Sequence, residues 1–141
     1  MKKQTVEQQI EIDWPIRALF NYVCDIHNNA TWQAQVDHAE WTAIDHYRTG
    51  ARYTCLQPGR TRPATYEVTE HTPYQRRAVT RRDAWLQPTY NMEFESRGER
   101  TLLRVSVSFN APWSLMAPWY AGKLLAAYDL PRLKQILETE N

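Results

Sequence analysis

The sequence predicts an α+β fold in which an antiparallel sheet packs against a long C-terminal helix. Three observations predict this class. A stretch of roughly seventy residues alternates apolar and polar side chains with a period of two, as half-buried strands do. Gly50, Gly59 and Gly98 lie in its short gaps, and short gaps join antiparallel neighbours. Near Pro112 the alternation stops, and apolar residues then spread around nearly every side of a helix.

One strand and two short helices are predicted before this stretch. Residues 5–12 alternate Val and Ile with polar side chains, as a half-buried strand does. Asp13 can cap the following helix and Pro15 suits its first turn, while the apolar residues of 16–23 recur at helical spacing. The polar residues 25–31 then predict turns and a second short helix, ending at a tryptophan that we expect to have a structural role, Trp32.

Six strands and the long helix complete the prediction. The strands are expected at residues 36–46, 51–56, 64–71, 78–83, 89–96 and 101–110. The last pair is the clearest, since both of its strands keep strict alternation on either side of Gly98. In the helix beyond, Pro131 predicts a kink near Asp129. With 141 residues and no linker, the chain is expected to be a single domain over residues 1–141.

Composition and motifs narrow the function classes. The formal net charge is only +1, so charge predicts neither nucleic-acid nor membrane binding. No secretory signal or span of about 20 apolar residues is present, and a cytoplasmic protein is expected. Cys24 and Cys55 show no CxxC spacing and are interpreted as free buried thiols. The histidines lack metal-ligand spacing and no phosphate loop occurs, so we expect no metal and no cofactor.

Four segments carry a resemblance to a known family. They are "IEIDWPIRALFNYVCDIHNNATWQAQV" with Pro15, Phe20, Val23, Asp25 and Trp32, "YEVTEHTPYQRRAVT" with Tyr66, Val68, Glu70 and Pro73, "SRGERTLLRVSVSF", and "DLPRLKQILE". In this order and spacing, the chain resembles the START-like (SRPBCC, helix-grip) superfamily, and within it the bacterial polyketide cyclase/dehydrase-like members. The resemblance implies a curved antiparallel sheet of about seven strands around the C-terminal helix.

The resemblance further implies a cavity between the sheet and that helix, and binding of a small hydrophobic or amphipathic molecule, lipid-like or polyketide-like. Abundant aromatic residues suit such a wall, although the same side chains could instead fill the cavity. The residues expected to line it are Tyr53, Tyr66, Trp85, Tyr90, Met92, Phe94, Phe109, Trp113, Met116, Trp119 and Tyr120.

Two other functions stay open. One is a polyketide cyclase, aromatase or dehydratase, which needs little beyond a shaped cavity and one or two proton-transfer groups. The candidate catalytic residues are His38, Glu70 and Arg82, drawn from a set that also holds Glu40, His71 and Arg81. The other is a protein-interaction module or homodimer built on the apolar residues 113–128.

Strand parity leaves two alternatives undecided. In "RRAVTRR", Arg76 and Arg82 share one face and Arg77 and Arg81 the other. In the strand expected at residues 36–46, Trp41 opposes His38 and Glu40, so only one of these two sets can face the cavity.

Overall fold

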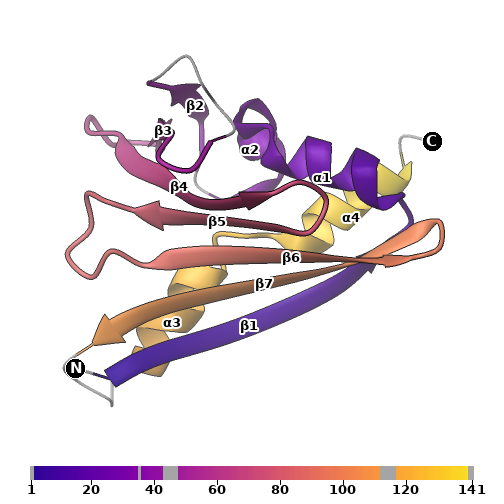
Figure 1. Cartoon of the computed structure of the whole chain (residues 1–141). Helices are drawn as coiled ribbons and strands as arrows, with labels where there is room; N and C mark the ends of the chain where they lie inside the picture. The colour runs from indigo at the N-terminus through magenta and orange to yellow at the C-terminus, as the bar shows by residue number, and fades with distance from the viewer. Residues whose placement is uncertain (1, 35, 43–47, 112–116, 140–141) are drawn as a thin grey trace.

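A single antiparallel sheet forms the body of the protein. The computed structural model describes residues 2–34, 36–42, 48–111 and 117–139. Seven strands are hydrogen-bonded in the order β1-β7-β6-β5-β4-β3-β2 (Figure 1). They are β1 (Lys2–Ile12), β2 (His38–Trp41), β3 (Arg52–Leu56), β4 (Ala64–Thr72), β5 (Arg76–Arg81), β6 (Thr89–Arg97) and β7 (Arg100–Ala111). The predicted antiparallel sheet is therefore confirmed.

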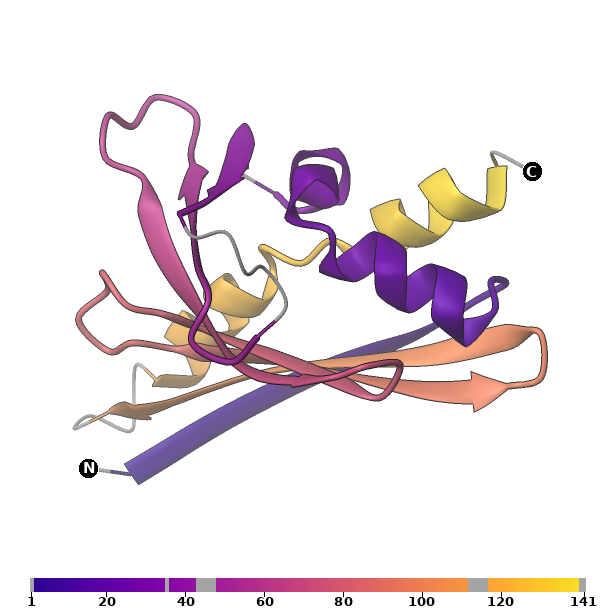
Figure 2. The same cartoon turned by 45° about the horizontal axis from the view of Figure 1, so that its top comes forward.

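The helices all lie on one side of this sheet, and the sheet curves around them (Figure 2). They are α1 (Ile16–Cys24), the 3₁₀ helix η1 (Ile26–Asn28), α2 (Asn29–Trp32), α3 (Ala117–Leu125) and α4 (Leu130–Thr139). We call the side of the sheet that they cover the helix-facing side and the opposite side the outer side. This arrangement is the helix-grip fold.

The alternation of side chains in the sequence decides which residues form the core. In the β6–β7 hairpin, Met92 pairs with Val105 and Phe94 with Leu103. All four side chains are buried on the helix-facing side. Burying a large apolar side chain contributes about 1.5–3 kcal/mol to stability. A register slip of one residue would turn these four side chains to the outer side and is therefore unfavourable.

Two predicted elements differ from the structure at their ends. The strand expected at residues 36–46 begins only at His38, which pairs with Leu56, the last residue of β3. The amide of Asp37 still donates to the carbonyl of Leu56 at 2.8 Å, but β3 ends at Leu56 and the strand pairing stops there. Residues 43–47 lie outside the described part of the chain. The expected cap of α1 is also wrong. Pro15 occupies the N-cap position without a side-chain cap.

The C-terminal helix is interrupted between α3 and α4, close to where a kink was predicted at Asp129. Pro131 is the second residue of α4, where its missing N–H does no harm. The Asp129 carboxylate accepts a hydrogen bond from the amide of Arg132 at 3.1 Å, which caps α4. The Gln8 side chain donates to the carbonyl of Tyr128 at 2.8 Å, so β1 holds the interruption in place. Two helices replace the expected single kinked one.

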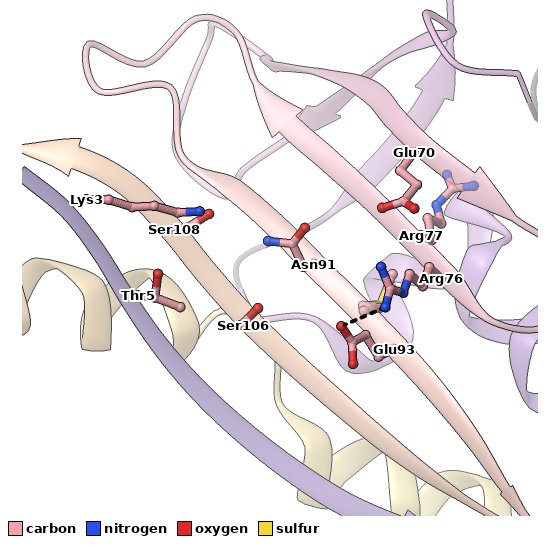
Figure 3. A pocket seen from close by; sticks show the side chains of 10 residues that line it. Lys3, Thr5, Glu70, Arg76, Arg77, Asn91, Glu93, Ser106 and Ser108 are labelled. Atoms are coloured by element: carbon pink, nitrogen blue, oxygen red, sulfur yellow. Dashed lines mark ion pairs between the residues drawn. The ribbon is translucent and has the colours of Figure 1, made fainter.

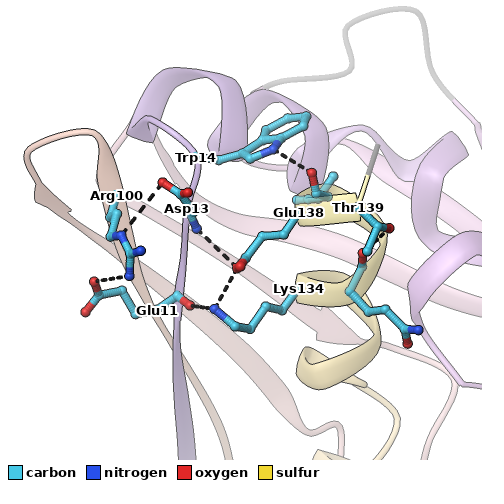
Figure 4. A network of polar contacts seen from close by, with 9 residues as sticks. Glu11, Asp13, Trp14, Arg100, Lys134, Glu138 and Thr139 are labelled. Atoms are coloured by element: carbon cyan, nitrogen blue, oxygen red, sulfur yellow. Dashed lines mark hydrogen bonds and ion pairs between the residues drawn. The ribbon is translucent and has the colours of Figure 1, made fainter. Parts of the chain in front are cut away.

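A polar network fastens α4 to the end of β1 (Figure 4). Lys134 Nζ donates to the carbonyl of Glu11 at 2.7 Å and to Glu138 Oε2 at 2.6 Å. The indole of Trp14 donates to the carbonyl of Leu137 at 2.9 Å. These contacts anchor α4 on β1, while α3 packs against β1 and β7.

Candidate functional site

Aromatic rings run across the helix-facing side of the sheet. Tyr53 and Tyr66 stack with centroids 5.2 Å apart, and Tyr90 and Tyr128 stack at the same distance. Trp41 packs edge-on against Tyr53 at 5.4 Å. Burial raises the pKa of Tyr66, and it raises that of Tyr90 to about 12. These phenols therefore stay neutral at physiological pH and offer hydroxyl groups without charge.

A pocket of about 640 Å³ opens between this aromatic row and α3. We call it the α3 pocket. The sheet contributes Tyr66, Arg81 and Tyr90 to its wall, and the remaining lining comes from α3 and four connecting segments. Those other residues are Ala34, Gln57, Arg60, Ala84, Trp119, Tyr120, Lys123, Leu124, Ala126 and Ala127. The wall is thus aromatic and aliphatic with a few polar groups, and its size lies in the usual range for small-molecule pockets.

Arg81 is the charged group that the sheet places in this pocket. Its Nε and Nη2 atoms contact the carboxylate of Asp83 at 3.1 and 3.2 Å. Asp83 also accepts a hydrogen bond from the amide of Thr65 at 2.9 Å. Partial burial alone would raise the pKa of Asp83, but these hydrogen bonds lower it below its ordinary value. Asp83 is therefore ionised and holds the Arg81 fork in a defined orientation.

The register of β5 decides the parity of the arginines. Val79 pairs with Val68 and Tyr90, which are buried on the helix-facing side, so Arg77 and Arg81 point inward with it. Arg76 and Arg82 point outward. Arg82 donates to Glu67 Oε2 at 3.3 Å. Arg82 therefore lies on the outer side of the sheet, away from the α3 pocket.

The other candidate catalytic residues lie outward as well. Glu70 pairs with outward-facing Ala78. It lines a polar groove of about 250 Å³ on the outer side, where Arg76 contacts Glu93 at 4.0 Å (Figure 3). On β2, Trp41 faces the cavity side, and exposed His38 and Glu40 pair with each other outside at 2.7 Å. Because strand parity separates them, His38, Glu70 and Arg82 do not form a site in the cavity.

A second pocket of about 420 Å³ lies beside α1 and is lined in part by Phe20, Cys24 and His71. Next to His71, Arg77 is buried and only 2 % exposed. Its Nη1 lies 3.4 Å from His71 Nδ1, and its Nη2 has no hydrogen-bond partner among the described residues. Burial and the neighbouring Arg77 charge lower the pKa of His71. The inner face of β5 therefore carries one arginine in the core and one in the α3 pocket.

The predicted lining residues separate into four groups. Tyr66, Tyr90, Trp119 and Tyr120 form part of the α3 pocket wall. Buried core positions are taken by Tyr53, Met92, Phe94 and Phe109. Trp85 on the β5–β6 loop is 73 % exposed and is not among the residues that line the α3 pocket. Trp113 and Met116 lie outside the described residues. Trp32 is fully buried against Tyr128, as its expected structural role requires.

Sequence reasoning missed several polar residues of the α3 pocket. Arg60 lies in the β3–β4 loop and Lys123 on α3. From residue type alone, both would be predicted to lie on the surface in contact with water. For Arg81, the sequence did contain a pattern that predicts its inward direction. Val79 is the large apolar residue in the centre of "RRAVTRR", so it marks the buried face and the arginines that share its parity.

Comparisons with known proteins agree with this architecture. A family model described as polyketide cyclase/dehydrase and lipid transport matches residues 3–138. No curated protein matches the chain. Among the described residues, none of the helices is long and apolar enough to cross a membrane.

Solved structures share the fold at low sequence identity. A Mesorhizobium loti protein is 17% identical with a TM-score of 0.77, and the alignment covers 98% of this chain and 99% of that one. A START superfamily protein from Mycobacterium smegmatis is 14% identical with a TM-score of 0.73, covering 97% and 99%. A Thermobifida fusca protein is 15% identical with a TM-score of 0.76, covering 92% and 90%. The chain belongs to the polyketide cyclase/dehydrase and lipid-transport family.

Proposed function

We propose that this protein binds a small hydrophobic or amphipathic molecule, lipid-like or polyketide-like, in the α3 pocket. The observation that carries the proposal is the pocket of about 640 Å³ between the aromatic row and α3. Tyr66, Tyr90, Tyr120 and Leu124 give it apolar surface that a ligand would remove from water. The phenol and guanidinium groups beside this surface would orient a ligand that has a polar end.

A cyclase-type enzyme is the second candidate, and it has less support. Four of the six residues expected to move protons lie on the outer side of the sheet: His38, Glu40, Glu70 and Arg82. His71 and Arg81 face inward, but they line different pockets. The phenols of Tyr66 and Tyr90 remain as neutral proton donors in the α3 pocket. Catalysis would require proton-transfer groups in the same pocket, whereas ligand binding does not, so the binding function has more support.

A protein-interaction module is the third candidate. The Trp119 indole is 63 % exposed, as an interface residue would be, but it also lines the α3 pocket and lies 5.3 Å from Lys123 Nζ. We therefore propose a small molecule as the partner, with neither a nucleic acid nor a second copy of the chain needed to complete the site. A cytoplasmic setting is proposed with it, since Cys24 and Cys55 are free thiols.

The experiment uses N-phenyl-1-naphthylamine, an uncharged probe that fluoresces in apolar surroundings. We expect saturable binding with one probe per chain. Leu124→Trp places a bulky ring in the pocket wall and is expected to weaken binding by about tenfold or more, since it occupies the space of the probe. Gln135→Trp adds the same ring on the exposed side of α4 and serves as the control.

The proposal predicts that the control binds the probe like the original protein. An absence of probe binding, or equal binding by the Leu124→Trp and Gln135→Trp variants, would contradict a binding function of this pocket. Thermal unfolding of each variant shows whether a loss of binding reflects a loss of fold.

A further inference from the structure

We propose that the ligand of the α3 pocket is an amphiphile with a carboxylate head group, bound by Arg60, Arg81 and Lys123; this inference rests on the proposed binding function. These three cations come from three separate parts of the chain: the β3–β4 loop, the end of β5, and α3. Their convergence on one pocket depends on the tertiary fold and cannot be seen as a charge run in the sequence.

The charge balance of the wall favours an anion. No Asp or Glu side chain lines the α3 pocket among the residues that the structure describes. Among the described contacts, the negative charge that offsets part of this positive charge is Asp83, which pairs with Arg81. One carboxylate against three cations leaves the pocket positively charged. A neutral ligand would leave this charge without a partner, whereas an anionic one would offset part of it.

Arg81 is held ready to bind a second carboxylate. Its contacts with Asp83 use Nε and Nη2, so within the described residues the Nη1 donors remain for a ligand. The side chain is 23 % exposed, and it is therefore reachable from the pocket while partly shielded from water. A guanidinium that is already oriented loses little conformational freedom when a carboxylate binds to it.

The apolar part of the wall accounts for the other half of the amphiphile. Tyr66 and Tyr90 form the sheet side of the pocket, and Tyr120 and Leu124 form the helix side. An alkyl chain or a fused ring between these two sides would keep its carboxylate within the region of Arg60, Arg81 and Lys123. The pocket therefore selects both an apolar body and a negative head.

Displacement of N-phenyl-1-naphthylamine by dodecanoate and by dodecan-1-ol tests this at pH 7.5 and moderate salt. The two competitors share the alkyl chain and differ in head-group charge. We expect dodecanoate to displace the probe at about tenfold lower concentration than the alcohol. Arg81→Gln is expected to weaken dodecanoate about three- to tenfold and to leave the alcohol unchanged.

Two controls and one further variant complete the experiment. Arg82→Gln removes the neighbouring arginine on the outer side, and Arg97→Gln removes a cation from the distant β6–β7 hairpin; neither should change dodecanoate binding. The double variant Arg60→Gln/Lys123→Gln alters only exposed side chains, so it tests the inference even if Arg81→Gln fails to fold. We expect it to weaken dodecanoate about tenfold.

The outcomes separate this inference from the proposed function. Equal displacement by dodecanoate and dodecan-1-ol, or unchanged dodecanoate binding in the double variant, would overturn the carboxylate inference and leave the binding function standing. Failure of the protein to bind the probe at all would overturn both. Selective loss of dodecanoate in the two pocket variants, with both controls unchanged, would support the inference.

Discussion

The ring of Tyr90 on β6 stacks on the ring of Tyr128, with centroids 5.2 Å apart and planes inclined by 15°. Tyr128 lies in the interruption between α3 and α4, where Gln8 of β1 and Trp32 of α2 also contact it. This one stack therefore joins the centre of the sheet to the point where the C-terminal helix changes direction. The width of the α3 pocket depends on that direction, since Tyr90 lines it on one side and α3 on the other.

Removing this stack should cost stability. Tyr128→Ala deletes a buried ring and leaves a cavity, so we expect the free energy of unfolding to fall by about 3–5 kcal/mol. Tyr128→Phe keeps the ring and is the matched control, with a loss of about 1 kcal/mol or less. Urea unfolding measures both. Equal losses in the two variants would show that the hydroxyl and not the stack carries the effect.

Replacing the buried Arg77, in contrast, should increase stability. Its Nη2 has no hydrogen-bond partner among the described residues, and no carboxylate is seen to pair with it there. Replacing such a buried charge by an apolar side chain is often stabilising, so Arg77→Leu should raise the free energy of unfolding by about 1–3 kcal/mol.

Arg76→Leu is the control for Arg77→Leu, because it makes the same change on the outer side of the same strand. We expect it to alter the free energy of unfolding by less than about 0.5 kcal/mol. A clear loss of stability in Arg77→Leu alone would contradict the prediction and show that the guanidinium contributes net binding energy to the core.

The two cysteines should be unreactive in the folded protein. Burial raises the pKa of the Cys24 thiol to about 12, against the opposing effect of Arg77, and burial raises that of Cys55 to about 12 as well. At pH 8 the thiolate fraction is then far below that of a free cysteine. A thiol-specific chromogenic disulfide should label neither residue until denaturant is added. Rapid labelling of native protein would contradict this.

Acid should destabilise the protein partly through His71. Burial and the Arg77 charge lower its folded-state pKa below the unfolded value of about 6.5. As the pH falls below that unfolded value, the unfolded chain takes up a proton that the folded chain binds less readily. Stability is therefore present above about pH 6.5 and is lost as the pH falls through the folded pKa.

Urea unfolding between pH 7.5 and 5 checks this pH dependence. In His71→Asn we expect a smaller decrease of the free energy of unfolding over this range than in the original protein. Arg77→Leu removes the positive charge that also lowers the pKa of His71. It should therefore reduce the decrease of the free energy of unfolding as well, by a smaller amount. Parallel curves for the three proteins would exclude His71 as a source of acid sensitivity.

The strands were predictable because their signal is local. The alternation in β6 and β7 predicts both strands and the face that each buries, and Gly98, with φ of 72°, accommodates the turn between them. The same signal was weaker in "RRAVTRR", where arginines occupy both faces and only Val79 marks the buried one. Long-range pairing with Val68 and Tyr90 resolved it.

The catalytic candidates show where local reasoning fails. His38, Glu70 and Arg82 have suitable chemistry, but each lies at the parity that turns it away from the helices. A side chain in a strand can face either way without changing local conformation, so its type does not reveal its direction. The contacts of the neighbouring strand decide that direction.

Local patterns in the sequence were sufficient to predict the class of fold, the order of elements and most of the core, because hydrophobic periodicity acts over a few residues at a time. The site, in contrast, depends on contacts between distant parts of the chain. Arg60, Arg81 and Lys123 are more than twenty residues apart from one another in the chain, yet they line one pocket. Their proximity arises from strand register and from the interruption at Tyr128, which are products of long-range packing that no local pattern encodes.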